Sequence, residues 1–427
     1  MTTDTSVPYS RLNDRYQILS LIGNGGMASV YKARDEFLDR LVAVKLFDSN
    51  LGEIADAANH EHELTMLARL NHHGLVTLID AGIVENKNPA LSRMFLVMEL
   101  VTGPTLLSLT ADQALTGQEI AQLGFDLAES LQYIHANGVI HRDVKPANVL
   151  IVDYGEGDDR PRAKLADFGI ALVTGVVADP SETLGTAAYL SPEQAMRDVI
   201  EPSTDIYSLG LCLLECFTRE LTFPGTAHVS AVARLISDPV IPENLPKPWF
   251  DLLTAMTARE PGDRPTAAEV TSAMGELIGF ERDRASGRTA AAETEPAAQV
   301  EADPEVFDRI ARIASRLLAA SIVIIASHGG DNRILAVHGI GAELVDRLNV
   351  LADPARGVSP LRREAEDMGR VHGALIRSDD GVPRAAFWVL DPKALSLSAF
   401  DDQNLADMVA LTAREVGRLS LPAARRI

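Results

Sequence analysis

The chain has 427 residues, of which 46% are hydrophobic and 23% are charged. This composition is typical of a soluble globular protein, and the length exceeds the ~250–300 residues at which single cores stop growing, so we expect more than one domain. The net charge of −21, with no basic block in the sequence, argues against nucleic acid or an anionic membrane surface as the main partner.

The sequence gives no sign of a membrane segment. The N-terminal stretch MTTDTSVPYS has no apolar signal core, and the longest apolar run, at 317–326, is about half of the ~20 residues needed to span a bilayer. Cys212 and Cys216 lie four residues apart in an apolar run, and we interpret them as buried structural thiols rather than a redox pair or a metal site. Without a disulfide framework the chain fits a reducing compartment, so we predict a cytoplasmic location.

The first zone, residues 16–79, begins with strand-like runs and continues with a helical pattern. The segment LIGNGGMASVYKA at 21–33 contains Gly23, Gly25 and Gly26 between two apolar runs. These glycines are typical of an ordinary hairpin turn, which is the stronger interpretation at this point; the alternative is a loop that covers phosphates, in which Ala28 stands where a third glycine is usual. The glycines alone leave both interpretations open.

Residues farther along the chain favour the phosphate interpretation. Lys45 lies in the strand-like run VAVK, and Glu63 on the following helical pattern could pair with it. The segment HRDVKPANVL at 141–150 places Asp143 and Asn148 five apart, which supplies a carboxylate to orient a hydroxyl and an oxygen ligand for magnesium. Asp167 in the segment DFG adds a carboxylate that could bridge metal and phosphates. These motifs, in this order and spacing, indicate phosphoryl transfer.

Residues 12–280 resemble the bacterial eukaryotic-type (Hanks-type) serine/threonine protein kinases. The resemblance implies an α+β, two-lobed fold, with a β-rich N-terminal lobe and a helical C-terminal lobe. It also implies ATP and Mg²⁺ as cofactors, with Mn²⁺ as an alternative metal. Asp143, Lys45 and Lys145 are then the catalytic residues, and Asn148 and Asp167 bind the metal. The implied nucleotide-binding residues are Ile22, Gly23, Gly25, Gly26, Val30, Ala43, Lys45, Glu63, Met98, Glu99, Val101 and Leu150.

The same resemblance bears on specificity and regulation. Lys145 is typical of the serine/threonine branch, because tyrosine kinases usually replace the lysine and proline of HRDxKPxN. Arg142 is expected to meet a phosphorylated activation segment. The candidate acceptors are Thr174, Ser181 and Thr183, of which we favour Thr183; the alternative is a kinase that works unphosphorylated. Glu193 and Arg264 match the family's buried ion pair, and Asp205 matches the residue that steadies the catalytic loop.

A composition change marks the end of this zone. Residues 281–303 lack aromatic residues, and we interpret them as a flexible linker. Residues 304–421 return to a helix, strand candidates and a closing helix, with an Asp-Gly hairpin signal in RSDDGVP. In pattern this region resembles a small GAF-like regulatory domain, which implies a small-molecule ligand; a packing or dimerisation module that binds no ligand is the alternative. A homodimer is compatible with either.

The sequence therefore predicts a serine/threonine protein kinase that transfers the ATP γ-phosphate to hydroxyls of protein substrates, autophosphorylates and is regulated by its C-terminal domain. The rival interpretation is a pseudokinase scaffold that binds nucleotide without turnover. Lys45, Asp143 and Asp167, whose loss would favour the scaffold, are all present.

Overall fold

The computed structural model describes residues 10–25, 28–50, 68–85, 92–152, 162–167, 187–287, 306–317, 322–327, 334–338, 370–377, 383–391 and 405–413. The chain divides into two compact units. The first comprises Met1–Ala231 and Asp238–Pro296, and the second comprises Val232–Ser237 and Ala297–Ile427. No helix among the described residues is long and apolar enough to cross a membrane.

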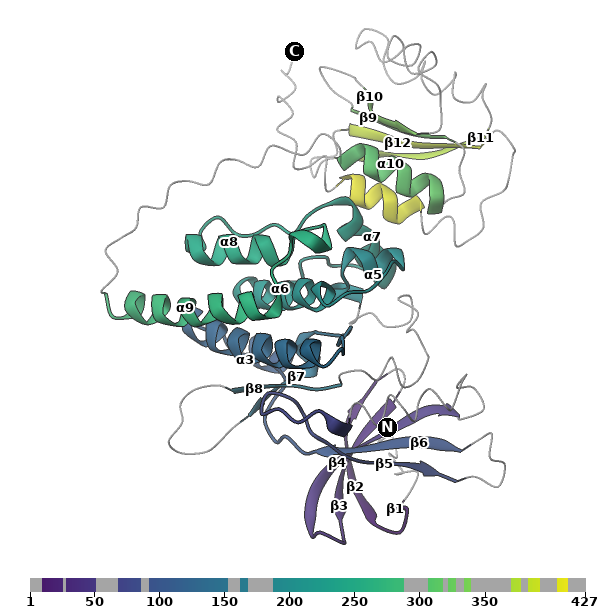
Figure 1. The fold of residues 1–427 in the computed structure, drawn as a ribbon. Coiled ribbons are helices and arrows are strands. Elements are labelled where there is room, and N and C mark those ends of the chain that lie inside the picture. The colour runs from purple at the N-terminus through teal and green to yellow at the C-terminus, as the bar shows by residue number, and fades with distance from the viewer. Residues whose placement is uncertain are drawn as a thin grey trace. The chain divides into compact units, whose positions relative to one another are not determined.

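The first unit begins with a six-stranded antiparallel sheet (Figure 1). Its strands are β1 (Arg11–Leu12), β2 (Tyr16–Asn24), β3 (Ala28–Asp35), β4 (Arg40–Asn50), β5 (Leu78–Val84) and β6 (Arg93–Glu99), in the order β1-β2-β3-β4-β6-β5. Alternate residues of β3 and β4, such as Tyr31, Ala33, Val42 and Val44, enter one core cluster with Phe95. This period of two is the pattern expected for strands with one buried face.

The rest of the first unit is mainly helical (Figure 1). The helices that lie wholly in this unit are α2 (Leu106–Asp112), α3 (Gly117–Ala136), α5 (Pro192–Met196), α6 (Ser203–Thr218), α8 (Lys247–Met256) and α9 (Ala267–Ala285). Helix α7 (Ala227–Ile236) begins in the first unit, and its residues from Val232 on belong to the second. Helix α6 is buried along nearly its whole length, as a helix at the centre of a lobe must be. Cys212 and Cys216 lie within it as buried free thiols, which confirms their structural interpretation.

Short elements connect the sheet to the helices. The 3₁₀ turn η3 (Pro146–Asn148) leads into β7 (Val149–Val152), which pairs with β8 (Arg162–Leu165) in a two-stranded sheet. Two further 3₁₀ turns, η4 (Ala187–Tyr189) and η5 (Pro261–Asp263), precede α5 and α9. The predicted division into a β-rich lobe and a helical lobe is thus confirmed for the described residues of this unit.

Helix α9 extends farther than composition predicts. It ends at Ala285, so the first five residues of the segment 281–303, interpreted as a linker, are helical. In this last part of the helix Glu281 is 6% exposed, and its Oε1 accepts a hydrogen bond of 2.9 Å from Trp249 Nε1, which ties the helix to α8. We correct the end of the helix accordingly; residues 288–303 lie outside the described part of the chain.

The second unit contains a four-stranded antiparallel sheet with helices (Figure 1). Helix α10 (Val306–Leu317) precedes β9 (Ile322–Ser327), β10 (Ile334–His338), β11 (Arg370–Arg377) and β12 (Pro383–Asp391), and a helix at 405–413 follows. The strand order is β10-β9-β12-β11. β11 and β12 pair directly, as the Asp-Gly signal predicts, and Phe307, Ile310 and Ala314 of α10 are buried as their spacing predicts.

Candidate active site

The buried carboxylate of Asp205 holds the loop between α3 and β7 in place. Asp205, at the start of α6, is fully buried and accepts hydrogen bonds of 2.8 Å from the backbone N–H groups of His141 and Arg142. His135 Nε2, at the end of α3, lies 2.8 Å from the same carboxylate. Arg142 adopts a left-handed conformation with φ of 67°, which is uncommon for a residue with a side chain. The buried acceptor therefore fixes a strained loop, a feature that is common at functional sites.

This loop brings together three of the predicted site residues. Lys145 Nζ lies 2.9 Å from Asp143 Oδ2. Asn148 Nδ2 donates to the same oxygen over 2.9 Å and to the backbone carbonyl of Asp143 over 2.8 Å. The Asp143 side chain remains 34% exposed, so it is oriented by two partners and is still open to an approaching molecule.

Lys45 and Asp167 meet across the junction of the two lobes. Lys45 Nζ, on β4, forms an ion pair of 2.8 Å with Oδ2 of Asp167, which lies two residues after the end of β8. The Lys45 side chain is 12% exposed and therefore does not point into solvent, as a lysine in a strand usually does. His141 Nε2 lies 3.0 Å from the carbonyl of Ala166, which links the catalytic loop to the residue before Asp167. Asp167 also has a positive φ, 63°.

The donor set at this junction suits magnesium. Because Nδ2 of Asn148 is used by Asp143, its amide oxygen is the atom left to face a metal. The carboxylate of Asp167 is 28% exposed and adds hard oxygen ligands of the kind that Mg²⁺ prefers. Asn148 and Asp167 therefore fit the metal-binding role that the sequence assigns to them.

The predicted nucleotide-binding residues lie on neighbouring strands. Gly23 and Val30 are partners in the β2–β3 pair, and Gly25 N donates to Ala28 O over 3.0 Å, so the glycine segment is part of a hairpin. Ala43 on β4 pairs with Met98 on β6. Leu150 on β7 pairs with Thr105 in an isolated bridge. Ile22 on β2 is 49% exposed.

Glu99 is held by a residue that the sequence analysis missed. Both Glu99 carboxylate oxygens accept hydrogen bonds of 2.7 Å from Lys164 Nζ on β8, and Glu99 N donates to Thr77 O over 2.9 Å. Lys164 ties the end of β6 to the strand that leads to Asp167. The available signal was a lysine inside an apolar strand, the same feature that drew attention to Lys45.

A buried ion pair supports the helices behind the loop. Arg264 donates to the two carboxylate oxygens of Glu193 over 2.7 and 2.9 Å, and both side chains are at most 5% exposed, which confirms the pairing predicted for them. Burial alone would raise the pKa of Glu193, but hydrogen bonds from Arg264 and Thr204 bring it below its ordinary value. Gln194 Nε2, next to Glu193, donates to Arg142 O over 2.8 Å. The pair is thereby linked to the catalytic loop.

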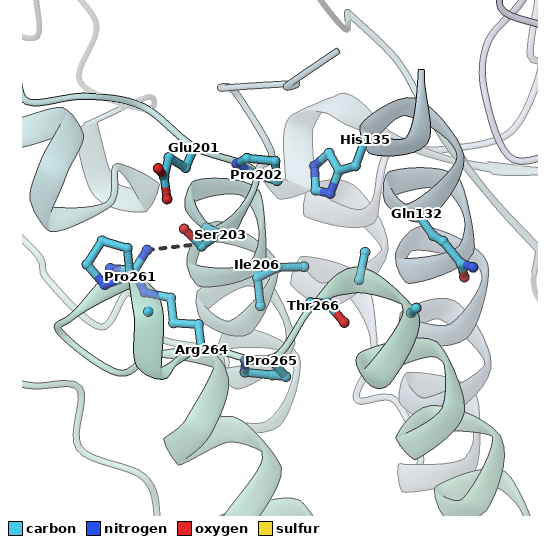
Figure 2. A pocket seen from close by; sticks show the side chains of 13 residues that line it. Gln132, His135, Glu201, Pro202, Ser203, Ile206, Pro261, Arg264, Pro265 and Thr266 are labelled. Atoms are coloured by element: carbon cyan, nitrogen blue, oxygen red, sulfur yellow. Dashed lines mark hydrogen bonds between the residues drawn. The ribbon is translucent and has the colours of Figure 1, made fainter. Parts of the chain in front are cut away.

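A cavity of about 360 Å³ lies beside this ion pair. Figure 2 shows Arg264 next to Ser203, whose carbonyl accepts its hydrogen bond, with His135 of α3 and Thr266 at the start of α9 along the wall. None of the predicted catalytic or nucleotide-binding residues lines it.

Several predicted residues lie outside the described part of the chain. They are Gly26, Glu63 and the acceptor candidates Thr174, Ser181 and Thr183. The predicted pairing of Lys45 with Glu63 and the phosphorylation of the activation segment therefore stay predictions.

The antiparallel sheet brings Lys45, whose side chain is 12% exposed, to a junction with Asp143, Asn148 and Asp167, and this arrangement is that of a protein kinase domain. The comparison with protein families agrees: the family model for the protein kinase domain matches residues 16–274, and the chain belongs to that family.

Three relatives illustrate the extent of the similarity. A probable serine/threonine-protein kinase of Clostridium perfringens is 33% identical over 282 residues, covering 64% of this chain and 39% of the relative. The serine/threonine-protein kinase PknB of Mycobacterium tuberculosis is 36% identical over 273 residues, covering 61% of this chain and 42% of PknB. PknL of the same organism is 35% identical over 279 residues, covering 63% and 67%. The chain thus spans about two fifths of the length of the first two relatives.

Proposed function

We propose that this protein is a serine/threonine protein kinase that transfers the γ-phosphate of ATP to hydroxyl groups of protein substrates. The observation that carries the proposal is the arrangement around Asp143. Its carboxylate is oriented by Lys145 and Asn148 yet one-third exposed, and Lys45 and Asp167 are paired at 2.8 Å in the same lobe junction. Phosphoryl transfer depends mainly on such positioning and charge stabilisation.

Each of these residues has a distinct role in the proposed reaction. Asp143 orients the substrate hydroxyl and accepts its proton, and Lys145 neutralises charge on the phosphoryl group in transfer. Lys45 positions the α- and β-phosphates, and Asn148 and Asp167 hold the divalent metal. Mg²⁺ neutralises the phosphate oxygens when bound, and Mn²⁺ shares its preference for oxygen ligands.

The glycine hairpin supports nucleotide binding. A Cβ atom built at Gly23 would lie 3.7 Å from Val30 Cβ, and one at Gly25 would lie 3.5 Å from Ala28 O, which are ordinary contacts. The fold itself therefore tolerates side chains at both positions. We attribute these glycines to the close approach of phosphates, which a side chain would obstruct. Val30, Ala43 and Leu150 would then contact the adenine, next to Met98 and the strand end at Glu99.

Preference for serine and threonine follows from Lys145 and Pro146, together with the names of the relatives, which are called serine/threonine-protein kinases. Both cysteines are free thiols, which favours a reducing compartment such as the cytoplasm.

We further propose that Arg142 receives a phosphorylated residue of the activation segment. Within the described residues, Arg142 Nε is buried and has no hydrogen-bond partner. A buried guanidinium N–H that lacks an acceptor is well suited to a phosphate oxygen. Mass spectrometry after incubation with Mg²⁺ and ATP should find phosphate on Thr183 or, failing that, on Ser181 or Thr174. Absence of phosphate from all three would refute this part of the proposal.

Radiolabelled autophosphorylation tests the enzymatic proposal. Full-length protein should incorporate label from ATP in the presence of Mg²⁺, the Asp143→Asn variant should not, and a Glu276→Gln variant, altered at an exposed position of α9, should behave as wild type. Binding of nucleotide without incorporation in any form, even with added protein substrates, would favour the pseudokinase scaffold.

For the second unit we propose a regulatory role. Its sheet flanked by helices agrees with the predicted GAF-like pattern and also with a module for homodimerisation. Comparison of full-length protein with a 1–284 truncation would give the sign of regulation from the label incorporated, and light scattering of both forms would reveal dimerisation. Equal activity of the two forms would refute the regulatory role. The same number of chains per particle in both forms would refute dimerisation through the second unit.

A further inference from the structure

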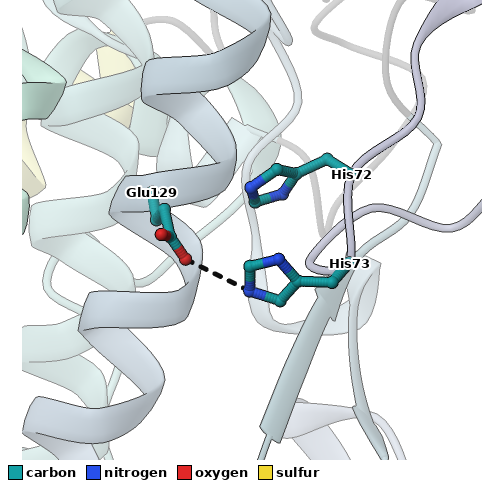
Figure 3. Close-up of side chains that lie close together, drawn as sticks. All are labelled: His72, His73 and Glu129. Atoms are coloured by element: carbon teal, nitrogen blue, oxygen red, sulfur yellow. Dashed lines mark ion pairs between the residues drawn. The ribbon is translucent and has the colours of Figure 1, made fainter.

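Two adjacent histidines face a glutamate at a place that the proposed reaction does not use. His72 and His73 lie in the loop before β5, and Glu129 lies on α3 (Figure 3). One potential ligand atom from each of the three residues falls within 4.8 Å of the other two. His73 Nε2 and Glu129 Oε2 are already 3.1 Å apart, and the two imidazole rings lie with centroids separated by 4.3 Å.

The loop that carries the histidines is firmly attached to its surroundings. His72 stacks on the Tyr133 ring at 5.0 Å, and Tyr133 Oη accepts a hydrogen bond of 3.1 Å from Asn71 N. Ser130 Oγ donates to Gly74 O over 3.0 Å. Because Tyr133 and Ser130 both belong to α3, the helix that presents Glu129 also fixes the loop that presents the two histidines.

We propose that His72, His73 and Glu129 form a binding site for a divalent transition-metal ion, for which zinc is the best match. Two imidazoles and one carboxylate are a ligand set that zinc takes in proteins, with water in the fourth position. The two sites also differ in metal preference: imidazole nitrogens suit zinc, whereas the oxygen ligands of Asn148 and Asp167 suit Mg²⁺.

Closing the site requires small movements of exposed groups. Zinc binds nitrogen and oxygen at about 2.0–2.2 Å, so the ligand atoms must draw together by about an ångström from their present spread. The His73 and Glu129 side chains are 54% and 36% exposed, and can make that movement without disturbing a core.

Metal binding would cost His72 one hydrogen bond. Its Nδ1 accepts a hydrogen bond of 3.2 Å from Gly74 N. A neutral ring bound to metal through either nitrogen loses that bond, because Nδ1 then either holds the metal or carries the proton.

The site would connect a metal to the active-site strands. Gly74 O accepts from Leu165 N over 2.8 Å, and Leu165 O accepts from Val76 N over 3.0 Å. Leu165 is two residues before Asp167. A metal bound by His72 and His73 would therefore restrict the motion of the adjoining segment 74–76, to which the end of β8 is hydrogen-bonded.

Calorimetric titration of zinc into the metal-free full-length protein tests the proposal. Excess Mg²⁺ is kept present, so that the oxygen ligands of Asn148 and Asp167 do not compete. We expect one equivalent of zinc to bind, and affinity to fall by about tenfold or more in His73→Ala and in Glu129→Gln. Both positions are solvent-accessible, so these variants should fold. His338→Ala on β10 and Glu276→Gln on α9 are the matched controls and should bind as wild type.

Cobalt(II) provides a second readout, because the visible d–d bands of a low-coordinate nitrogen and oxygen site should appear in wild type and in the controls only. Failure to bind zinc in the presence of Mg²⁺ would overturn the proposal. So would zinc binding of equal affinity in all four variants, since the ion would then be held elsewhere on the chain.

Discussion

Asp205, which supports the catalytic loop, and Asp143, which lies on it, differ in burial and in how fully their carboxylates are hydrogen-bonded. Asp205 is fully buried, and two backbone N–H groups and one histidine ring nitrogen each lie 2.8 Å from its carboxylate. Asp143, on the loop that Asp205 holds, is 34% exposed and has Lys145 and Asn148 as side-chain partners. A buried acid must have its hydrogen-bonding capacity used, or the fold is destabilised. A reacting acid must keep part of it free for substrate. The comparison predicts that the two residues fail differently when altered.

The largest effect should come from Asp143→Asn. Asparagine preserves the size of the side chain but cannot accept a proton, so phosphate transfer should fall by about 10²–10⁴-fold. Since the side chain is partly exposed, the thermal unfolding midpoint should stay close to that of wild type. Initial rates of radiolabel transfer and a thermal melt on the same preparation check both halves. A large drop in the melting temperature would mean that Asp143 also supports the fold.

Asp205→Asn should lower stability more than Asp143→Asn does, and activity less. The substituted asparagine would keep one acceptor oxygen and lose the charge to which His141 N and Arg142 N donate, so we expect stability to fall by about 2–3 kcal/mol. Activity should fall less than in Asp143→Asn, because the proton acceptor is retained on a loosened loop. Urea unfolding curves and rates measured well below the transition separate the two effects. Unchanged stability would contradict the role of Asp205 as the buried anchor.

The roles of Asp143 and Asp205 were not equally predictable from the sequence. The positions of Asp143, Asn148 and Asp167 follow from short motifs, because chemistry restricts both residue type and spacing there. The Glu193–Arg264 pair and the role of Asp205 were predicted only through resemblance to a family, since the partners are 71 and about 63 residues apart in the chain.

Other features depend on tertiary contacts that no local pattern encodes. Lys164 reaches Glu99 across 65 residues, and the buried Glu281 accepts a hydrogen bond from Trp249 of α8, which is 32 residues away in the chain. Glu281 lies in a stretch without aromatic residues, so composition predicts a linker where the structure has the last turns of α9. Strand pairing in the second unit was easier to predict, because the β11–β12 hairpin is local.

The buried ion pair extends the comparison to pH. Because the pKa of Glu193 is lowered in the folded protein, its contribution is fully present above the ordinary value of 4.5 and is lost as pH falls through the folded value below it. Stability should therefore decline below about pH 4.5, by about 1.4 kcal/mol for each unit by which this pKa is lowered. Asp35, whose pKa a hydrogen bond from Arg15 lowers to about 2, contributes in an overlapping range.

Glu193→Gln isolates the share of the ion pair, because it leaves Asp35 intact. The slope of unfolding free energy against pH below 4.5 should be shallower in this variant than in wild type. Chemical denaturation at a series of pH values measures that slope. Identical slopes would show that Glu193 does not titrate differently in the folded and unfolded chain.

The smallest expected effect concerns the thiols of α6. Like Asp205, and unlike Asp143, they are buried. Burial raises the pKa of Cys216 to about 12 and raises that of Cys212 as well, so neither forms the reactive thiolate near neutral pH. A disulfide reagent should therefore label both thiols only when the protein unfolds, and Cys216→Ala should leave phosphate transfer unchanged while costing a modest amount of stability. Fast labelling of the native protein would show that α6 opens readily, and the helix that positions Asp205 could then not be the rigid support that the comparison requires.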